Sequence, residues 1–315
     1  MQKQGQAPVF AAIEAGGTKF VCAVGNGPGR IVRRTRIDTR DPAVTMSEVA
    51  AFLTAARTEL GPFAGLGVAS FGPVRLDPGA PDFGRLLATP KPGWDGVDLV
   101  GSLAAAADCP AALDTDVNAA ALAEMKLGAG RGCDTVVYVT IGTGIGAGIV
   151  VRGQPIHGLL HPEAGHLLVR RHPADGGFGG ICPYHGDCCE GLASGPAIAA
   201  RSGAAAEDLP ADHPHWAIVA DAIGQLCASL ALTISPQRIL LGGGVMSDGR
   251  LIPAIREATA RILNGYLVPL RSPESLEAFI SKPGLAEPGL AGAFLLAKRA
   301  SVERVSYLPL PDSHG

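Results

Sequence analysis

Residues 135–152 read TVVYVTIGTGIGAGIVVR, and this stretch decides the predicted fold. The β-branched run 135–141 predicts a strand, the glycine-rich segment 142–146 a tight turn, and residues 147–152 a second strand. Residues 9–24, VFAAIEAGGTKFVCAV, repeat the same order of strand, Gly/Thr turn and strand. A unit that opens both halves of a chain indicates a duplicated fold, so we expect two similar α/β lobes.

The remaining patterns extend each copy of this unit into a lobe. A third strand at about 31–37 continues an antiparallel meander, and Thr45 with Glu48 has the spacing of a capping box that starts a helix. This order predicts a first lobe at 1–115, completed by a C-terminal helix, and a second lobe at 116–288, with a ligand cleft between them. We further expect strands at 66–70, 111–114 and 238–241 and helices at 98–107, 118–127, 217–234, 250–263 and 289–299.

Composition and charge describe a globular chain without a polyanionic partner. The chain has 315 residues, of which 47% are hydrophobic and 17% charged, and its net charge is −3. The first eight residues lack the apolar segment of a secretory signal, and no apolar run has the ~18 residues of a membrane span. Residues 218–234 come closest, but Asp221, Gln225 and Ser229 give that helix a polar stripe. We therefore expect a cytoplasmic protein with no membrane or nucleic-acid partner.

Three glycine-rich turns are candidates for binding a nucleotide. In the turn 14–19, paired glycines expose backbone N–H groups, Thr18 adds a hydroxyl, Lys19 adds a charge, and Glu14 can hold Mg²⁺ directly or through water. The turn 142–146 lies at the equivalent point of the second half, and Gly242-Gly243-Gly244 follows a strand directly. Each turn alone is also explained by an ordinary connection, but two equivalent turns can hold the phosphates of one nucleotide.

The segment Asp114-Thr115-Asp116-Val117-Asn118 joins the carboxyl end of a strand to a helix. Ligands of α/β sheets gather outside the carboxyl ends of strands. A carboxylate there can accept the proton of a hydroxyl that attacks phosphorus. The alternative for Asp116 is a helix N-cap, which explains one of the two aspartates but not both together with Asn118.

The segment 157–195 carries a metal signal. His166 is followed by Cys182, His185 and Cys188, the last three at intervals of three residues. Two thiolates and two imidazoles form a tetrahedral zinc site, and four protein ligands make that zinc structural. The alternative is a coincidental Cys/His loop, which is uncommon at this spacing.

The other cysteines, histidines and glutamates are not interpreted as metal ligands. Cys189 adjoins a ligand and is expected to point away from the metal. Glu163 and Glu190 flank the ligands, so a rigid loop would hold two acceptors for sugar hydroxyls, although surface charge is the usual role of Glu. An odd number of cysteines, seven, argues against a disulfide framework. We expect His157, His161 and His172 at the surface or behind the ligands, and Cys22, Cys109, Cys133 and Cys227 as inert core thiols.

Taken together, these motifs resemble the ROK family of sugar kinases and repressors, and they are most similar to its bacterial fructokinases over about residues 9–298. The resemblance implies a two-lobed actin/hexokinase-like (ribonuclease H-like) ATPase fold with a small structural zinc subdomain, and a tendency to form homodimers. The motifs that carry it are EAGGTK (14–19), DTDVN (114–118), IGTGIG (141–146), HPEAGH (161–166), CPYHGDCCEGLASGP (182–196) and LGGGVM (241–246).

The same resemblance implies an ATP-dependent fructokinase that makes fructose 6-phosphate, with Asp116 as catalytic base and Mg²⁺ accompanying ATP. It assigns sugar contacts to Asn118, Glu163, His166 and Glu190, with His166 also a zinc ligand. It assigns nucleotide contacts to Gly16, Gly17, Thr18, Lys19, Thr143, Gly144 and Gly243.

Three departures narrow the resemblance. Glu14, Thr115 and His185 stand where many members have Asp, Asn and Cys, and all three are similar to the fructokinase branch, which weakens a glucokinase interpretation. Segments 71–73 and 89–94 also look like fructokinase segments that lie near the sugar. The alternatives are a kinase for mannose, glucose or an amino sugar, a sugar-sensing repressor, and a catalytically silent regulator. Too few residues precede the first strand for a helix-turn-helix, and the catalytic residues argue against a silent protein.

Overall fold

The computed structural model describes residues 7–89 and 91–303. Contacts divide these residues into two compact units, each described here by itself. Unit 1 comprises residues up to Ala123, His157–His161 and the chain from Glu287, and unit 2 comprises Glu124–Ile156 and Pro162–Ala286. The expected boundary at 115/116 therefore differs from the contact-based one at 123/124, because the first half of the helix that carries Asp116 packs with unit 1.

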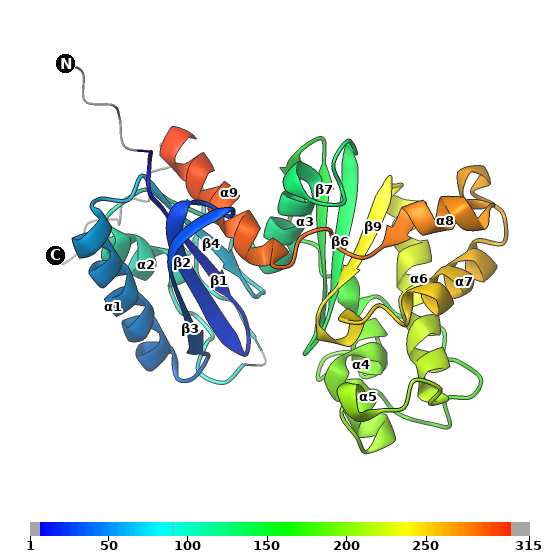
Figure 1. Ribbon diagram of the computed structural model, residues 1–315. Coiled ribbons are helices and arrows are strands. Elements are labelled where there is room, and N and C mark those ends of the chain that lie inside the picture. The colour runs from blue at the N-terminus through cyan, green and yellow to red at the C-terminus, as the bar shows by residue number, and fades with distance from the viewer. Residues whose placement is uncertain (1–6, 90, 304–315) are drawn as a thin grey trace. The chain divides into compact units, whose positions relative to one another are not determined.

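Unit 1 is a mixed sheet with helices on both faces (Figure 1). Its first three strands form the expected antiparallel meander, and the fourth and fifth join in parallel. Alternate strand residues face opposite cores, one under α1 and α2 and the other under α9. The strand order is β3 (Arg30–Asp38), β2 (Lys19–Gly27), β1 (Phe10–Ala15), β4 (Gly65–Ser70), β5 (Ala111–Thr115), and the helices are α1 (Pro42–Leu60), α2 (Leu99–Ala107), α3 (Asp116–Leu127) and α9 (Pro288–Glu303).

Unit 2 repeats this sheet. β6 pairs antiparallel with β7 and parallel with β9, as β1 does with β2 and β4, which confirms the duplicated unit expected from the sequence. The strand order is β8 (Gln154–Pro155), β7 (Ile145–Val151), β6 (Thr135–Ile141), β9 (Arg238–Gly242), β10 (Ile280–Ser281), and the helices are α4 (Cys189–Ala193), α5 (Gly195–Ser202), α6 (His215–Ile234), α7 (Ile252–Leu263) and α8 (Pro273–Phe279).

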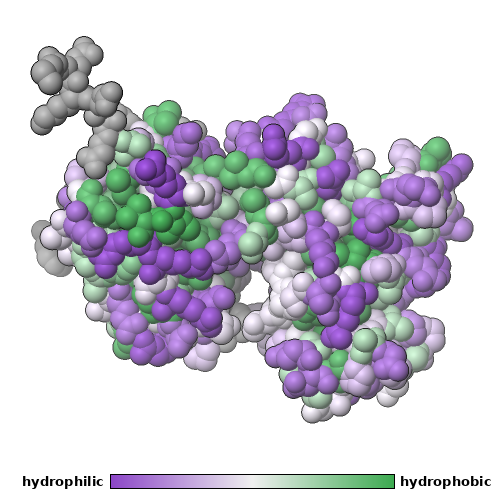
Figure 2. Space-filling view, viewed as in Figure 1, coloured by the Kyte–Doolittle hydropathy of each residue, from purple (hydrophilic) through white to green (hydrophobic). Residues whose placement is uncertain are grey.

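Helix α6 is long and apolar enough to span a membrane, the one such helix among the described residues, but 61% of its apolar window is buried in the protein. It belongs to the core that also contains β6, β7 and α7. Its polar stripe is internally bonded, because the Gln225 amide donates to Asp221 at 2.9 Å and the Ser229 hydroxyl donates to the Gln225 carbonyl at 2.9 Å. On the face drawn in Figure 2, hydrophobic side chains gather in one area of unit 1, whereas hydrophilic and hydrophobic side chains are mixed over unit 2.

The capping box expected at Thr45 is wrong. Helix α1 begins at Pro42, and Asp41 caps it by accepting the Ala43 N–H at 2.9 Å. Thr45 is buried inside the helix, where its hydroxyl accepts the Arg40 N–H at 3.0 Å. The Asp-Pro pair sets the helix start because proline at the first helical position lacks the N–H that would otherwise need a partner.

Glu124 holds together two segments of unit 2 that are far apart in the chain, one at residue 129 and one at residues 284–285. This carboxylate has no exposed surface and accepts three backbone N–H groups, from Ala129 at 2.7 Å, Gly284 at 2.9 Å and Leu285 at 2.8 Å. The chain passes between the units at four points, and the first (123/124) and the last (286/287) lie near these segments. One buried carboxylate therefore holds together the chain segments beside the first and the last crossing.

Candidate active site

The turn between β5 and α3 places Asp116 at the first position of α3. Its Oδ1 accepts the Val117 N–H at 2.8 Å, which orients the carboxylate. The cap of α3 is supplied by Thr115, whose hydroxyl accepts the Asn118 N–H at 3.1 Å. The N-cap alternative for Asp116 is therefore not what the structure shows.

Asp114, two residues before Asp116, is buried. Its Oδ1 accepts the Thr115 N–H at 2.8 Å and the Asn118 side-chain amide at 2.8 Å, and His157 Nε2 lies 3.1 Å from both carboxylate oxygens. The hydrogen bond to Asp114 raises the pKa of His157, against a smaller opposing effect of burial. Asn118 is fully buried, so the structure gives its amide nitrogen the task of holding Asp114.

Two histidines at the start of segment 157–195 contact residues of unit 1 that lie far away in the chain. Besides His157, His161 is buried and its Nε2 accepts the Val74 N–H at 3.2 Å. Sequence reasoning placed both at the surface or behind the metal ligands. Their partners lie far away in the chain, so local spacing carried no signal for these contacts.

The segments similar to fructokinases include a buried aromatic cluster. Trp94 packs against Phe20 and Phe71, with ring centroids 5.5 and 5.6 Å apart, and donates its indole N–H to the Arg40 carbonyl at 3.0 Å. Trp94 has no exposed surface, and its contact with Phe71 packs it against segment 71–73. Pro90, in the same expected segment, lies outside the described residues.

The four expected metal ligands converge in unit 2. Their ligand atoms all lie within 4.8 Å of one another. His166 Nδ1 is 3.6 Å from the sulfurs of Cys182 and Cys188 and 3.3 Å from His185 Nδ1. A tetrahedral zinc with bonds of about 2.3 Å to sulfur and about 2.0 Å to nitrogen requires separations of about 3.6 Å and about 3.3 Å. The donor set and its spacing therefore fit zinc.

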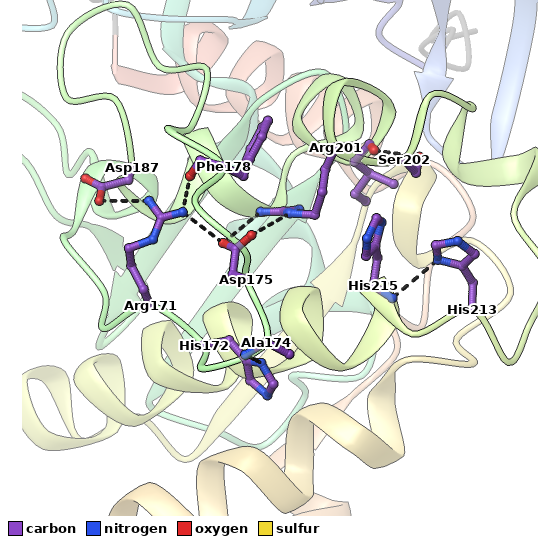
Figure 3. A network of polar contacts seen from close by, with 11 residues as sticks. Arg171, His172, Ala174, Asp175, Phe178, Asp187, Arg201, Ser202, His213 and His215 are labelled. Atoms are coloured by element: carbon purple, nitrogen blue, oxygen red, sulfur yellow. Dashed lines mark hydrogen bonds and ion pairs between the residues drawn. The ribbon is translucent and has the colours of Figure 1, made fainter.

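Polar contacts brace the loop that carries these ligands (Figure 3). Arg171 reaches Asp187 at 3.2 Å, next to Cys188, and also Asp175 at 3.3 Å and the Phe178 carbonyl. Asp175 is buried and also pairs with Arg201 of α5 at 3.2 Å. These bonds fix the loop to the body of unit 2.

Neighbouring cysteines behave differently from the ligands. Cys189 is buried and its sulfur faces the Ala222 carbonyl at 3.7 Å, so it points away from the cluster as expected. Burial raises the pKa of Cys22 and of Cys227 to about 12, which agrees with inert core thiols. Cys109 and Cys133 are half-buried rather than core residues.

Glu163, His166 and Glu190 come together beside the metal ligands. Glu190 Oε1 lies 4.0 Å from His166 Nε2, the ring nitrogen that is not part of the cluster. Burial, and then the charge of Glu190, raises the pKa of Glu163 to about 7. Glu190 Oε2 accepts the Ile145 N–H at 2.8 Å, which ties this group to the glycine turn of unit 2.

Two expected glycines of unit 2 lie close to neighbouring atoms, and the backbone requires glycine at the second of them. A Cβ at Gly144 would lie 2.6 Å from the Glu190 carboxylate, and one at Gly243 would lie 2.4 Å from the Ile141 carbonyl. Gly243 also has a φ of +92°, which side chains rarely adopt. Thr143 lies in the same turn as Gly144, so the structure brings the expected nucleotide-binding residues of this unit to the strand ends of β6 and β9.

The glycine turn of unit 1 closes the hairpin between β1 and β2. Gly16 N–H donates to the Lys19 carbonyl at 2.9 Å, while Gly17, Thr18 and Lys19 are exposed. Burial raises the pKa of Glu14, and the charge of Glu287 adds to that effect. The exposed N–H groups and the ammonium make this turn available to an anion.

Comparison with known proteins agrees with this arrangement. The sequence model of the ROK family matches residues 10–300. The chain is 41% identical to a fructokinase from Pediococcus pentosaceus, covering 93% of this chain and 98% of the relative. It is 43% identical to a fructokinase from Zymomonas mobilis, covering 93% and 97%. A ROK family glucokinase from Streptomyces griseus, solved with glucose and AMPPNP, has a TM-score of 0.73 at 26% identity, covering 92% of this chain and 99% of that one. The chain therefore belongs to the ROK family.

Proposed function

We propose that this protein is an ATP-dependent fructokinase that phosphorylates D-fructose at the 6-hydroxyl. The observation that carries the proposal is the similarity to two fructokinases, at 41% and 43% identity over 93% of the chain. The Asp116 turn, the glycine turns and the Glu163–His166–Glu190 group supply the residues that such a reaction needs.

In the proposed reaction Asp116 is the general base. The fructose O6 attacks the γ-phosphorus, the new O6–P bond forms, the bond to the β-phosphate oxygen breaks, and ADP leaves. The carboxylate of Asp116 takes the hydroxyl proton as this happens. The Val117 N–H bond at 2.8 Å supports this role because it fixes one carboxylate oxygen.

Phosphate binding is assigned to the glycine turns. Lys19 and the exposed N–H groups of Gly17 and Thr18 are assigned to bind some of the phosphate oxygens. Thr143 and Gly144 are assigned to bind others. Mg²⁺ would come with ATP and neutralise phosphate charge, with Glu14 holding it directly or through water. Gly16 and Gly243 are assigned to the same nucleotide, since their missing side chains let the backbone approach it closely.

Sugar binding is assigned to Glu163, His166 and Glu190, with Asn118 on the Asp116 side. The burial of Asn118 favours an indirect contribution through Asp114. Zinc would be held by His166 Nδ1 with Cys182, His185 and Cys188, and its role would be structural because all four positions are protein ligands. It leaves His166 Nε2 for the sugar.

The wider features of the proposal follow from the same resemblance. The duplicated mixed sheets suit the actin/hexokinase-like type of fold, with the zinc segment as a small subdomain. The expected assembly is a homodimer, the expected location is the cytoplasm, and no nucleic acid or membrane partner is proposed. The alternative substrate is another hexose, which the likeness to a glucokinase solved with glucose favours.

The test is a coupled ADP-release assay across fructose, mannose, glucose and amino sugars at fixed ATP. We expect fructose to give the highest kcat/KM, and product analysis to give fructose 6-phosphate. Asp116→Ala should lose turnover yet retain fructose binding by calorimetry, while Asp212→Ala, at an exposed site, should match the wild type. Full activity of Asp116→Ala would end the proposal for the base, and no activity on any hexose would end the proposed function.

A further inference from the structure

Three hydrogen bonds form a closed ring around Asp116. Asp114 accepts the Thr115 N–H, the Thr115 hydroxyl accepts the Asn118 N–H, and the Asn118 amide donates back to Asp114, at 2.8, 3.1 and 2.8 Å. Asp116 lies within the chain that this ring encloses. The geometry of the turn therefore depends on the orientation of the Asp114 carboxylate.

His157 is attached to this ring from outside. Both bonds of the ring that reach the Asp114 side chain end on Oδ1, whereas His157 Nε2 lies 3.1 Å from Oδ1 and from Oδ2. His157 therefore contacts both carboxylate oxygens of Asp114, and its Nε2 also lies 3.4 Å from the Asn118 amide nitrogen. Without His157 the carboxylate could rotate and carry the Asn118 amide with it.

Charge makes this contact more important. Asp114 is only 3% exposed, and a buried carboxylate without a partner is strongly disfavoured. His157 is partly exposed, with 39% of its side chain accessible, so it can gain a proton from solvent and offset that charge. Arg299 of α9 acts on His157 in the opposite direction, by its positive charge.

We infer that His157 is a positioning residue for phosphoryl transfer: through Asp114 it holds the β5–α3 turn in the conformation in which Asp116 accepts the proton. This inference rests on the proposed function. His157 lies 43 residues after Asp114 in the chain and is not among the expected metal ligands. Neither fact by itself indicates a role in catalysis.

The test compares the kcat of variants on the full chain, once the wild type is shown to phosphorylate fructose. His157→Phe removes the donor, and a misplaced base lowers kcat by about 10–100-fold. The KM for ATP should change by less than about twofold, since uniform binding is untouched. His172→Phe is the matched control, because the His172 ring accepts an N–H within its own turn.

A double-mutant cycle identifies the path of the effect. Asp114→Asn keeps an oxygen acceptor but removes the charge, so adding His157→Phe to it should lower kcat by less than about threefold if His157 acts through Asp114. Equal effects of His157→Phe in both backgrounds would overturn the inference.

A cavity variant keeps the test decisive if His157→Phe does not fold. Added imidazole should restore the kcat of His157→Ala in a saturable manner. The melting temperature of His157→Ala without imidazole should not fall by enough to explain its loss of kcat. An active wild type whose His157→Ala variant keeps full kcat would overturn the inference. An inactive wild type would instead overturn the proposed function.

Discussion

Glu124 is expected to be among the most sensitive single residues for the stability of unit 2. Its carboxylate accepts the N–H groups of Ala129 and Gly284 on Oε2 and of Leu285 on Oε1. Replacement by Ala leaves three partly buried N–H donors without that acceptor. Replacement by Gln keeps one oxygen, which can serve the two donors at Oε2 but turns an NH₂ group toward the third.

The two changes should differ in size. A hydrogen bond to a charged group contributes about 1.5–3 kcal/mol, and an unsatisfied buried donor costs about 1–3 kcal/mol. Glu124→Gln should therefore lower the free energy of unfolding by about 2 kcal/mol. Glu124→Ala should lower it by about 3–5 kcal/mol, toward the low end of the sum because water can enter the space.

The two tryptophans allow the measurement to be made on unit 2 alone. Trp94 belongs to unit 1 and Trp216 to α6 of unit 2. In a Trp94→Phe background, urea unfolding followed by fluorescence reports on Trp216. Glu59→Gln is the control, because Glu59 is 60% exposed in a surface ion pair and should change stability by less than about 0.5 kcal/mol. Equal free energies of unfolding for Glu124→Gln and Glu124→Ala would refute the view that the loss of stability grows with the number of N–H donors left without an acceptor.

Three further outcomes are expected. Gly67→Ala should destabilise unit 1 by about 1–3 kcal/mol or more, because its Cβ would lie 1.8 Å from a backbone carbonyl of α9. Gly29→Ala places its Cβ in open space and should leave the stability unchanged. The midpoints of urea unfolding of the two variants measure the difference. Cys182→Ser should lose metal from a purified protein that carries about one zinc per chain, and Cys227→Ser should keep it, as measured by elemental analysis. The raised pKa of His157 means that its ion pair stabilises the fold fully below the ordinary value of 6.5, and that this is lost as pH rises through the raised value. The stability difference between wild type and His157→Gln should thus be largest near pH 6 and shrink, from at most about 1 kcal/mol, toward pH 9; a constant difference would contradict this.

Local patterns carried most of the fold. The expected strand 135–141 has the same bounds in the structure, because a β-branched run bounded by glycine leaves few alternatives. The start of α1 was misplaced because two capping patterns compete there, and the Asp41-Pro42 pair fixes the helix one turn earlier than Thr45. Such competition between neighbouring caps is settled by burial, which the sequence does not display.

In the candidate site too, the residues that are close in the chain were predicted, and those that depend on distant contacts were not. The metal ligands were predicted because three of them lie within one short loop, and only His166 comes from farther away. Glu124 looks in the sequence like any helix-surface glutamate, and its burial depends on residues 284–285. His157 pairs with a residue 43 positions earlier, so no periodicity could reveal it.

The duplication also explains why the two glycine turns are not equivalent. The unit 1 turn is closed by its own hairpin and by Thr39, whose hydroxyl donates to the Gly16 carbonyl at 2.7 Å. The unit 2 turn is instead bonded to Glu190, which follows the ligand Cys188 in the chain. The bond from the Ile145 N–H to Glu190 therefore links this turn to the loop that carries the metal ligands. Among the described residues the unit 1 turn has no bond of this kind, so a shift of the metal-bearing loop is expected to reach the turn at 142–146 and not the one at 14–19.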